Sequence, residues 1–144
     1  MFLNAVPKAL NWLRRRGTEL PVWASLVDRI AHTGFRVLDH LIVYGSLSPG
    51  GPNHPRLAAL GGTWEAGWVE GQLQEVGWGA QLGFPAIHWQ PGGTRVAAHL
   101  LRSATLRKHW PELDRFEGAG YQRILVPFYS DQGSKAIGYL YAAA

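Results

Sequence analysis

The chain has 144 residues, of which 47% are hydrophobic, with 18 glycines, 9 prolines and 7 tryptophans. This length predicts one domain with a sizeable core, and the composition is that of a compact, turn-rich and mostly β protein, which excludes intrinsic disorder. There is no cysteine. Disulfides, cysteine-ligated zinc and a thiol nucleophile are therefore excluded, and we expect a cytoplasmic protein.

The net charge of +4 comes from the N-terminal segment. Residues 1–18 contain four basic side chains and no acidic one, whereas the other 126 residues hold ten of each sign. A nucleic-acid-binding domain needs a basic patch on its folded body. We therefore expect no nucleic-acid partner for the body of this protein.

Two amphipathic helices are predicted before the first strand. In residues 1–16 apolar side chains recur at helical spacing and three arginines follow them, and a second pattern runs from Pro21 to about Thr33. The favoured interpretation of residues 1–16 is a surface helix or tail. Docking on a membrane surface or a partner, and a targeting peptide, stay open as alternatives. We expect residues 1–37 to form a helical extension before a domain at 38–144.

From Leu41 onward the hydrophobic pattern is that of strands. The pattern has short apolar runs and alternating segments bounded by glycine-rich turns, and it predicts strands over residues 41–44, 63–74, 85–89, 95–101, 121–129 and 136–142. Gly92-Gly93 predicts a hairpin between the third and fourth strands. Asp131-Gln132-Gly133 predicts the turn between the last two.

One helix is predicted within this domain, over about residues 105–116. Pro111 is expected to restart it as a first-turn residue. Many strands with one or two helices predict an α+β fold, namely a small β-barrel with helices packed against it.

The first candidate site segment runs from Tyr44 to His54, directly after an apolar strand. Its small residues can form a tight structural turn or point backbone N–H groups at an anion. A nucleotide phosphate loop is not expected, because Gly51 and Pro52 stand where that motif needs lysine and serine or threonine.

The second candidate segment places Glu117 at the end of the predicted helix, between Phe116 and Gly118-Ala119-Gly120. An isolated glutamate is most often a solvated surface group. Here the apolar and small neighbours and the negative end of the helix dipole both favour a raised pKa, as a proton shuttle near neutral pH requires. Asp114, one turn earlier, is expected to make local hydrogen bonds rather than to act in catalysis.

The two segments together resemble the gamma-glutamylcyclotransferase (AIG2-like) family, most closely its gamma-glutamylamine cyclotransferase branch. The family's opening signature stands here from Tyr44 to His54. Its second motif is matched by six residues, which are Leu113, Asp114, Phe116, Glu117, Tyr121 and Arg123. The resemblance covers roughly residues 41–142.

The resemblance implies a mixed β-barrel enzyme that releases 5-oxoproline and a free amine from a small gamma-glutamyl substrate. It implies no cofactor and no metal. It implies that Glu117 is the catalytic acid and base. Substrate binding is assigned to Tyr44, Gly45, Ser46, Leu47 and Tyr121.

The middle of the chain matches the family more loosely. Phe84-Pro85-Ala86 resembles the family's aromatic-Pro-Ala step. Ala98, His99 and Leu101 stand where the family often has glycine, glutamate and tyrosine. This departure bears on substrate preference and activity.

Two other functions stay open from the sequence. The same pocket could bind an amino-acid-like ligand without catalysis, or the protein could be a scaffold that acts through its N-terminal helices. Alternatively, residues 1–16 could associate with a membrane or with nucleic acid. The six histidines show no metal-binding spacing, and Trp64 and Trp68 are expected to pack on the sheet rather than to stack on bases.

Overall fold

The computed structural model describes residue 8, residues 36–74 and residues 85–144. Apart from residue 8, the helices predicted over residues 1–16 and 21–33 lie outside the described residues, and of the predicted extension over residues 1–37 only residues 8, 36 and 37 are described. Phe84 of the aromatic-Pro-Ala step also lies outside the described residues.

Six strands and four short helical segments make up the described part of the domain. The helical segments are η1 (Val37–Asp39), α3 (Pro55–Ala58), η3 (Ala104–Lys108) and α4 (Trp110–Glu117). The strands are β1 (His40–Val43), β2 (Thr63–Gln74), β3 (Ala86–Trp89), β4 (Thr94–Arg102), β5 (Tyr121–Ser130) and β6 (Lys135–Ala143). All six predicted strands and the helix before Glu117 are present, whereas the helix at Pro55–Ala58 was not predicted.

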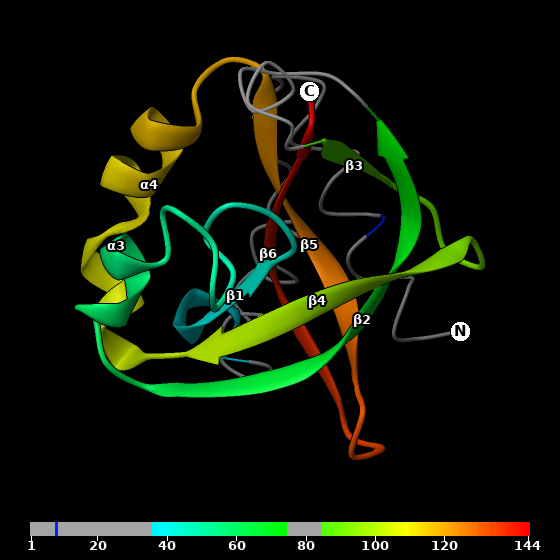
Figure 1. Ribbon diagram of the computed structural model, residues 1–144, viewed down its shortest axis with the longest axis horizontal. Coiled ribbons are helices and arrows are strands. Elements are labelled where there is room, and N and C mark those ends of the chain that lie inside the picture. Colours follow the sequence, from blue (N-terminus) through cyan, green and yellow to red (C-terminus); the bar gives the residue numbers. More distant parts are fainter. Residues whose placement is uncertain (1–7, 9–35, 75–84) are drawn as a thin grey trace, which may run out of the picture.

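Five of the strands close into a barrel in the order β1–β4–β2–β5–β6 and back to β1 (Figure 1). The sheet is mixed, because β1 pairs in parallel with β6 and the other pairs of this circuit are antiparallel. The predicted α+β fold with a small mixed barrel is therefore confirmed.

The predicted hairpin between β3 and β4 is wrong. β3 pairs with one edge of β2 and β4 pairs with the other, so the turn at residues 90–93 crosses over β2. The crossing falls at Gly71, whose register partners are Trp89 on one side and Thr94 on the other. A Cβ at Gly71 would lie 2.6 Å from the carbonyl oxygen of His88, so the close approach of the chain requires glycine at this position.

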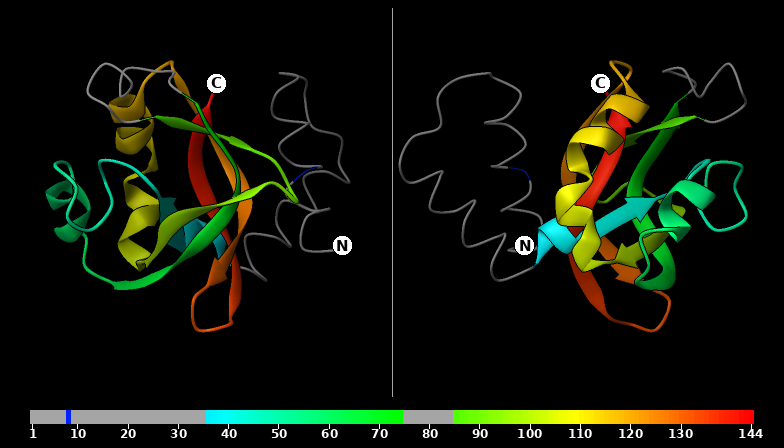
Figure 2. Two further views of the ribbon diagram at one scale, coloured as in Figure 1. Left: turned by 45° about the vertical axis from the view of Figure 1, so that its right-hand side comes forward. Right: turned by 90° about the vertical axis from the view of Figure 1, so that its left-hand side faces the viewer.

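Alternation along the strands divides the buried side chains into two layers. The barrel interior takes residues from all six strands, including Ile42, Val69, Ile87, Leu100, Phe128 and Leu140. The opposite faces of the same strands pack against the helices, in a cluster that includes Leu41, Leu101 and Tyr139 with Leu57, Leu106 and Leu113. Figure 2 shows α4 alongside β5 and β6, over this second layer.

Candidate functional site

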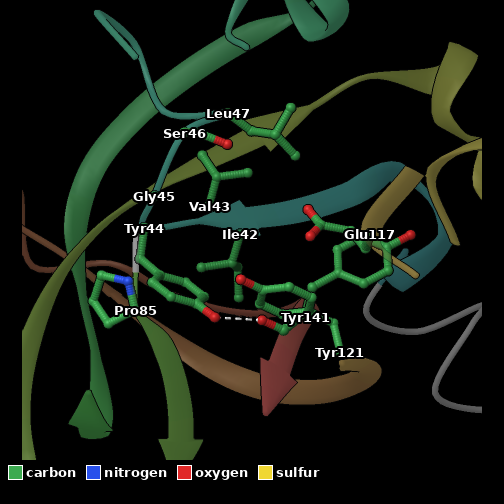
Figure 3. A pocket seen from close by; sticks show the side chains of 10 residues that line it. All are labelled: Ile42, Val43, Tyr44, Gly45, Ser46, Leu47, Pro85, Glu117, Tyr121 and Tyr141. Carbon is green, nitrogen blue, oxygen red and sulfur yellow. Dashed lines mark hydrogen bonds between the residues drawn. The ribbon is translucent and has the colours of Figure 1, made fainter. Parts of the chain in front are cut away.

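A small pocket lies where the chain leaves β1, beside the end of α4 and the facing ends of β5 and β6. Its cavity is about 40 Å³, which is space for about three water molecules and hence for one end of a small molecule. Ten of the described residues line it, namely Ile42, Val43, Tyr44, Gly45, Ser46, Leu47, Pro85, Glu117, Tyr121 and Tyr141 (Figure 3). All six site residues predicted from the sequence are among them.

The loop after β1 is pinned by its own hydrogen bonds. The Asn53 side-chain amide donates to the Ser46 hydroxyl at 3.0 Å, and the Nδ1 atom of His54 bonds the Leu47 carbonyl at 3.1 Å. Backbone bonds from Ser48 to Gly45 and from Asn53 to Ser46 complete the turn. The Pro-Asn-His end of the segment therefore holds its Gly-Ser-Leu start in place.

This pinning leaves the start of the loop with unused donors. Within residues 36–74 and 85–144, the amide hydrogens of Gly45, Ser46 and Leu47 donate to no protein acceptor. All three residues line the pocket. Backbone N–H groups without internal partners are donors available to an anionic or carbonyl oxygen.

Tyr44 ties this loop to two other strands. Its hydroxyl donates to the Tyr141 carbonyl at 2.6 Å and accepts from the Ile87 amide at 3.0 Å. Burial raises the pKa of the Tyr44 hydroxyl, so it stays neutral at physiological pH. The ring thus forms one wall of the pocket, and the hydroxyl joins the first, third and last strands.

Glu117 is the last residue of α4, and Gly118 ends the helix. Gly118 has φ 77° and ψ −170°, a region that only glycine enters without strain. Leu113 and Trp110 bury the inner face of the helix against the barrel. The helix therefore ends with the Glu117 side chain among the pocket residues.

The Glu117 carboxyl group is buried and has no polar partner. The residue is 9% exposed, and among the described residues no side chain or backbone group bonds to its carboxylate. Burial raises its pKa to about 7, because removal from water penalises the charged form. A carboxyl group with this pKa can both accept and release a proton near neutral pH.

Asp114 lies outside the pocket and is fully paired. It accepts two hydrogen bonds from the Arg123 guanidinium, at 2.9 and 3.3 Å, and one from the Tyr141 hydroxyl at 2.7 Å. These bonds run from the helix to β5 and β6. Asp114 thus makes hydrogen bonds, as expected, although with partners on the sheet.

Four pocket residues were not predicted as site residues, namely Ile42, Val43, Pro85 and Tyr141. Ile42 and Val43 belong to the strand that leads into the loop. Pro85 stands in the weaker aromatic-Pro-Ala match, which was the one signal for it. Tyr141 carries no motif signal, since it reaches the site through pairing between strands far apart in the sequence.

The residues that depart from the family pattern do not line the pocket themselves, although His99 is the register partner of the lining residue Val43. Ala98, His99 and Leu101 are on β4, and none of them is a lining residue. Ala98 and Leu101 are buried, and His99 is half-buried opposite Val43. These residues pack the barrel wall.

The tryptophans of β2 also pack on the sheet, as predicted. Trp64 lies partly buried against the helix-side layer, with its ring 5.0 Å from that of His54. Trp68 stacks on Tyr129 with ring centroids 5.7 Å apart.

Within residues 36–74 and 85–144, no helix is long and apolar enough to cross a membrane.

The comparisons with known proteins agree with this fold. Residues 41–144 match the family model described as gamma-glutamyl cyclotransferase, AIG2-like. An AIG2-like protein of Mus musculus is similar to the chain, with 24% identity and a TM-score of 0.57, over 74% of this chain and 77% of that one. No match is found to a curated protein.

Two further solved structures share the fold. A protein of Arabidopsis thaliana, solved in solution, is 22% identical with a TM-score of 0.55, over 72% of this chain and 67% of that one. A protein specific to uropathogenic E. coli is 21% identical with a TM-score of 0.50, over 72% and 78%. At these identities the likeness concerns the fold alone.

Proposed function

Because the chain belongs to the gamma-glutamyl cyclotransferase, AIG2-like family, we propose that it converts a gamma-glutamyl amine or gamma-glutamyl amino acid into 5-oxoproline and a free amine. The observation that supports this most directly is that one small pocket contains both a buried carboxyl group and backbone N–H donors that have no partners among the described residues. The proposed substrate is a small molecule.

The reaction is an intramolecular aminolysis. The free α-amine of the substrate attacks the γ-carbonyl carbon, a five-membered ring closes, and the bond from that carbon to the γ-linked nitrogen breaks. The nucleophile is part of the substrate, so the protein supplies orientation, one proton shuttle and stabilisation of the oxyanion. In this mechanism neither a metal nor a cofactor takes part.

Glu117 is the proposed proton shuttle. Its carboxylate takes a proton from the substrate α-ammonium group, which makes the amine nucleophilic. The resulting carboxylic acid then gives this proton to the departing nitrogen, and the second proton of the attacking nitrogen passes by the same carboxylate to the released amine, which leaves as an ammonium ion. Both steps need a group whose pKa lies near the working pH, and burial gives Glu117 that pKa, at about 7.

The loop after β1 is the proposed binding element. The amides of Gly45, Ser46 and Leu47 bind the α-carboxylate of the substrate or the oxyanion that develops on its γ-carbonyl oxygen. Among the described residues that line the pocket there is no lysine or arginine, so neutral N–H donors bind the negative charge there. Tyr44 shapes the wall, and Tyr121 hydrogen-bonds the substrate beside Glu117.

The test is to incubate the purified protein with a panel of gamma-glutamyl amino acids, gamma-glutamyl polyamines and gamma-glutamyl-lysine isopeptides and to measure 5-oxoproline. Glu117→Gln is the control, since it keeps the size of the side chain and removes the acid. We expect product from the wild type alone, and the substrate that reacts identifies the leaving amine. If no panel member gives product, the proposal fails in favour of a binding or scaffold function.

A further inference from the structure

We propose that Asp114, Arg123 and Tyr141 form a clamp that positions Glu117, so that the bonds to the Asp114 carboxylate, which lies outside the pocket, set the turnover rate without contact with the substrate. We call these three residues the Asp114 clamp. This inference rests on the proposed cyclotransferase activity, although one of the readouts below does not depend on it.

The need for a clamp follows from the surroundings of Glu117. Among the described residues its carboxylate has no hydrogen bond or ion pair that could orient it. The ionisable side chains that line the pocket with it are Tyr44, Tyr121 and Tyr141, from the β1 loop, β5 and β6. The place of the carboxylate is therefore set by where the last turn of α4 is held.

The clamp holds the last turn of α4 through Asp114, which is three residues before Glu117. Asp114 and Glu117 are at positions i and i+3 of α4, so they lie on neighbouring parts of one helix face. Asp114 binds Arg123 and Tyr141 together, and these two are register partners across β5 and β6. One carboxylate thus fixes the helix to two adjacent strands.

Arg123 is itself held in place by aromatic rings. Its guanidinium lies 4.7 Å from the centroid of the Trp110 ring and 4.5 Å from that of Tyr139. Such contacts are attractive and restrict the orientation of the guanidinium plane. The planar fork therefore meets both oxygens of Asp114 in a fixed direction, which a lysine cannot reproduce.

Tyr141 joins the clamp to the other half of the pocket. Its hydroxyl donates to Asp114, and its backbone carbonyl accepts the bond from Tyr44, which begins the binding loop. The same residue therefore connects the segment that carries Glu117 with the segment that carries the backbone donors. Figure 3 shows Tyr141 between these two sides of the pocket.

The molecule offers a matched control for the clamp. Asp39 and Arg107 form an ion pair of similar geometry, with Nε to Oδ1 at 2.6 Å and Nη2 to Oδ2 at 3.5 Å. This pair joins η1 to η3, and neither residue lines the pocket. A loss that is merely structural affects both pairs, whereas a positioning effect is confined to the clamp.

The experiment compares Arg123→Lys and Tyr141→Phe with the controls Arg107→Lys and Tyr129→Phe. Arg123→Lys keeps the charge, and Tyr141→Phe removes one oxygen atom. With the substrate found by the panel, we expect both clamp variants to lower kcat about tenfold, since small misplacements of a reacting group are costly, and to leave KM within about twofold. The controls keep the wild-type kcat.

A second readout is the pKa of Glu117, measured by NMR from the side-chain carboxyl carbons of ¹³C-labelled glutamate, with Glu117→Gln to assign the signal. A released helix end lets water reach the carboxylate, so we expect its pKa to fall by at least about half a unit in both clamp variants and in neither control. This measurement tests the clamp even if no panel substrate reacts.

The outcomes separate the two proposals. An unchanged pKa of Glu117 together with an unchanged kcat in both clamp variants overturns the clamp. A rise in KM with unchanged kcat overturns it as well, because it indicates contact with the substrate. Absence of activity in the wild type, with the pKa of Glu117 lowered in the clamp variants alone, refutes the proposed reaction and retains the clamp.

Discussion

The two carboxyl groups of α4 lie one helical turn apart in opposite environments. Asp114 faces the groove beside β5, is half exposed and accepts three hydrogen bonds. Glu117 faces the pocket, is buried and has no partner among the described residues. The same helix therefore uses one acid to hold the structure and presents the other as a group that can change its charge.

The contacts that Glu117 lacks are as informative as those that Asp114 makes. A buried carboxyl group without partners costs stability when it ionises, so its neighbours must be held by other interactions. The paired acid of the same helix supplies them. Four predictions test whether Asp114 holds the structure while Glu117 carries the proton, beginning with the largest effect.

Glu117→Gln is expected to lower kcat by about 10²–10⁴-fold, the range of one general acid–base group. Asp114→Asn leaves the shuttle intact and is expected to lower kcat about tenfold, through position alone. Steady-state kinetics measure the loss of kcat in each variant, and circular dichroism checks that both variants are folded. Equal losses in the two variants would contradict the division of roles.

The pH dependence of stability is expected to differ between the wild type and Glu117→Gln. Burial raises the folded-state pKa of Glu117 to about 7 from its ordinary value of 4.5, so the folded protein binds more protons than the unfolded chain between these pH values. Stability therefore falls as pH rises through this window, by about 2–3 kcal/mol between pH 5 and pH 8. Urea unfolding at the two pH values measures it.

Subtracting the free energy of unfolding of Glu117→Gln from that of the wild type at each pH isolates the contribution of Glu117. Burial lowers the pKa of His40 in the folded protein, so the contribution of His40 to stability rises with pH between this lowered pKa and its ordinary value. The contribution of His40 has the opposite pH dependence to that of Glu117, is the same in both proteins and therefore cancels when the two free energies are subtracted. The activity should show the complementary dependence, because kcat/KM rises with pH as Glu117 ionises near pH 7. A difference that does not change with pH would mean that Glu117 is not buried as described.

Asp114→Asn is expected to lower the free energy of unfolding by about 1–2 kcal/mol at pH 7, since bonds to a charged group are worth more than neutral ones but Asp114 is partly exposed. Equilibrium denaturation measures the loss. In contrast to Glu117→Gln, the loss should persist from pH 6 to pH 8. A gain in stability would show that the charge of Asp114 is not needed by Arg123.

Arg107→Lys is expected to have the smallest effect on the free energy of unfolding, because the Arg107 side chain is half exposed and exposed ion pairs contribute little to stability. Its kcat should equal that of the wild type. Added salt should reduce even this small difference, since exposed ion pairs are screened. Thermal unfolding at low and high salt measures it, and a large salt-independent loss would remove Arg107 as a control for the clamp.

Much of the barrel could be predicted from local patterns. Alternation and glycine-rich turns located the strands, because a strand with one face toward the interior and one toward the helices must alternate. The connection at Gly92-Gly93 could not be predicted. A glycine pair indicates a turn but not which strand the following segment joins, and here β2 lies between the two strands that the turn connects.

The candidate site was predictable where its residues are neighbours in the sequence. The loop from Tyr44 and the segment ending at Glu117 each carry a pattern of their own, and both line the pocket. Tyr141 could not be predicted, because its role depends on the register that places it opposite Arg123 and within reach of Tyr44. Pairing of this kind is a property of the closed barrel.

The parallel pairing of β1 with β6 also bears on how the protein folds. Leu41 and Tyr139 are register partners and lie at opposite ends of the described domain, so joining them closes a very long loop. Contacts between such distant segments form late and slowly. The pocket lies at this seam, so catalytic activity should return during refolding only with the slowest structural phase.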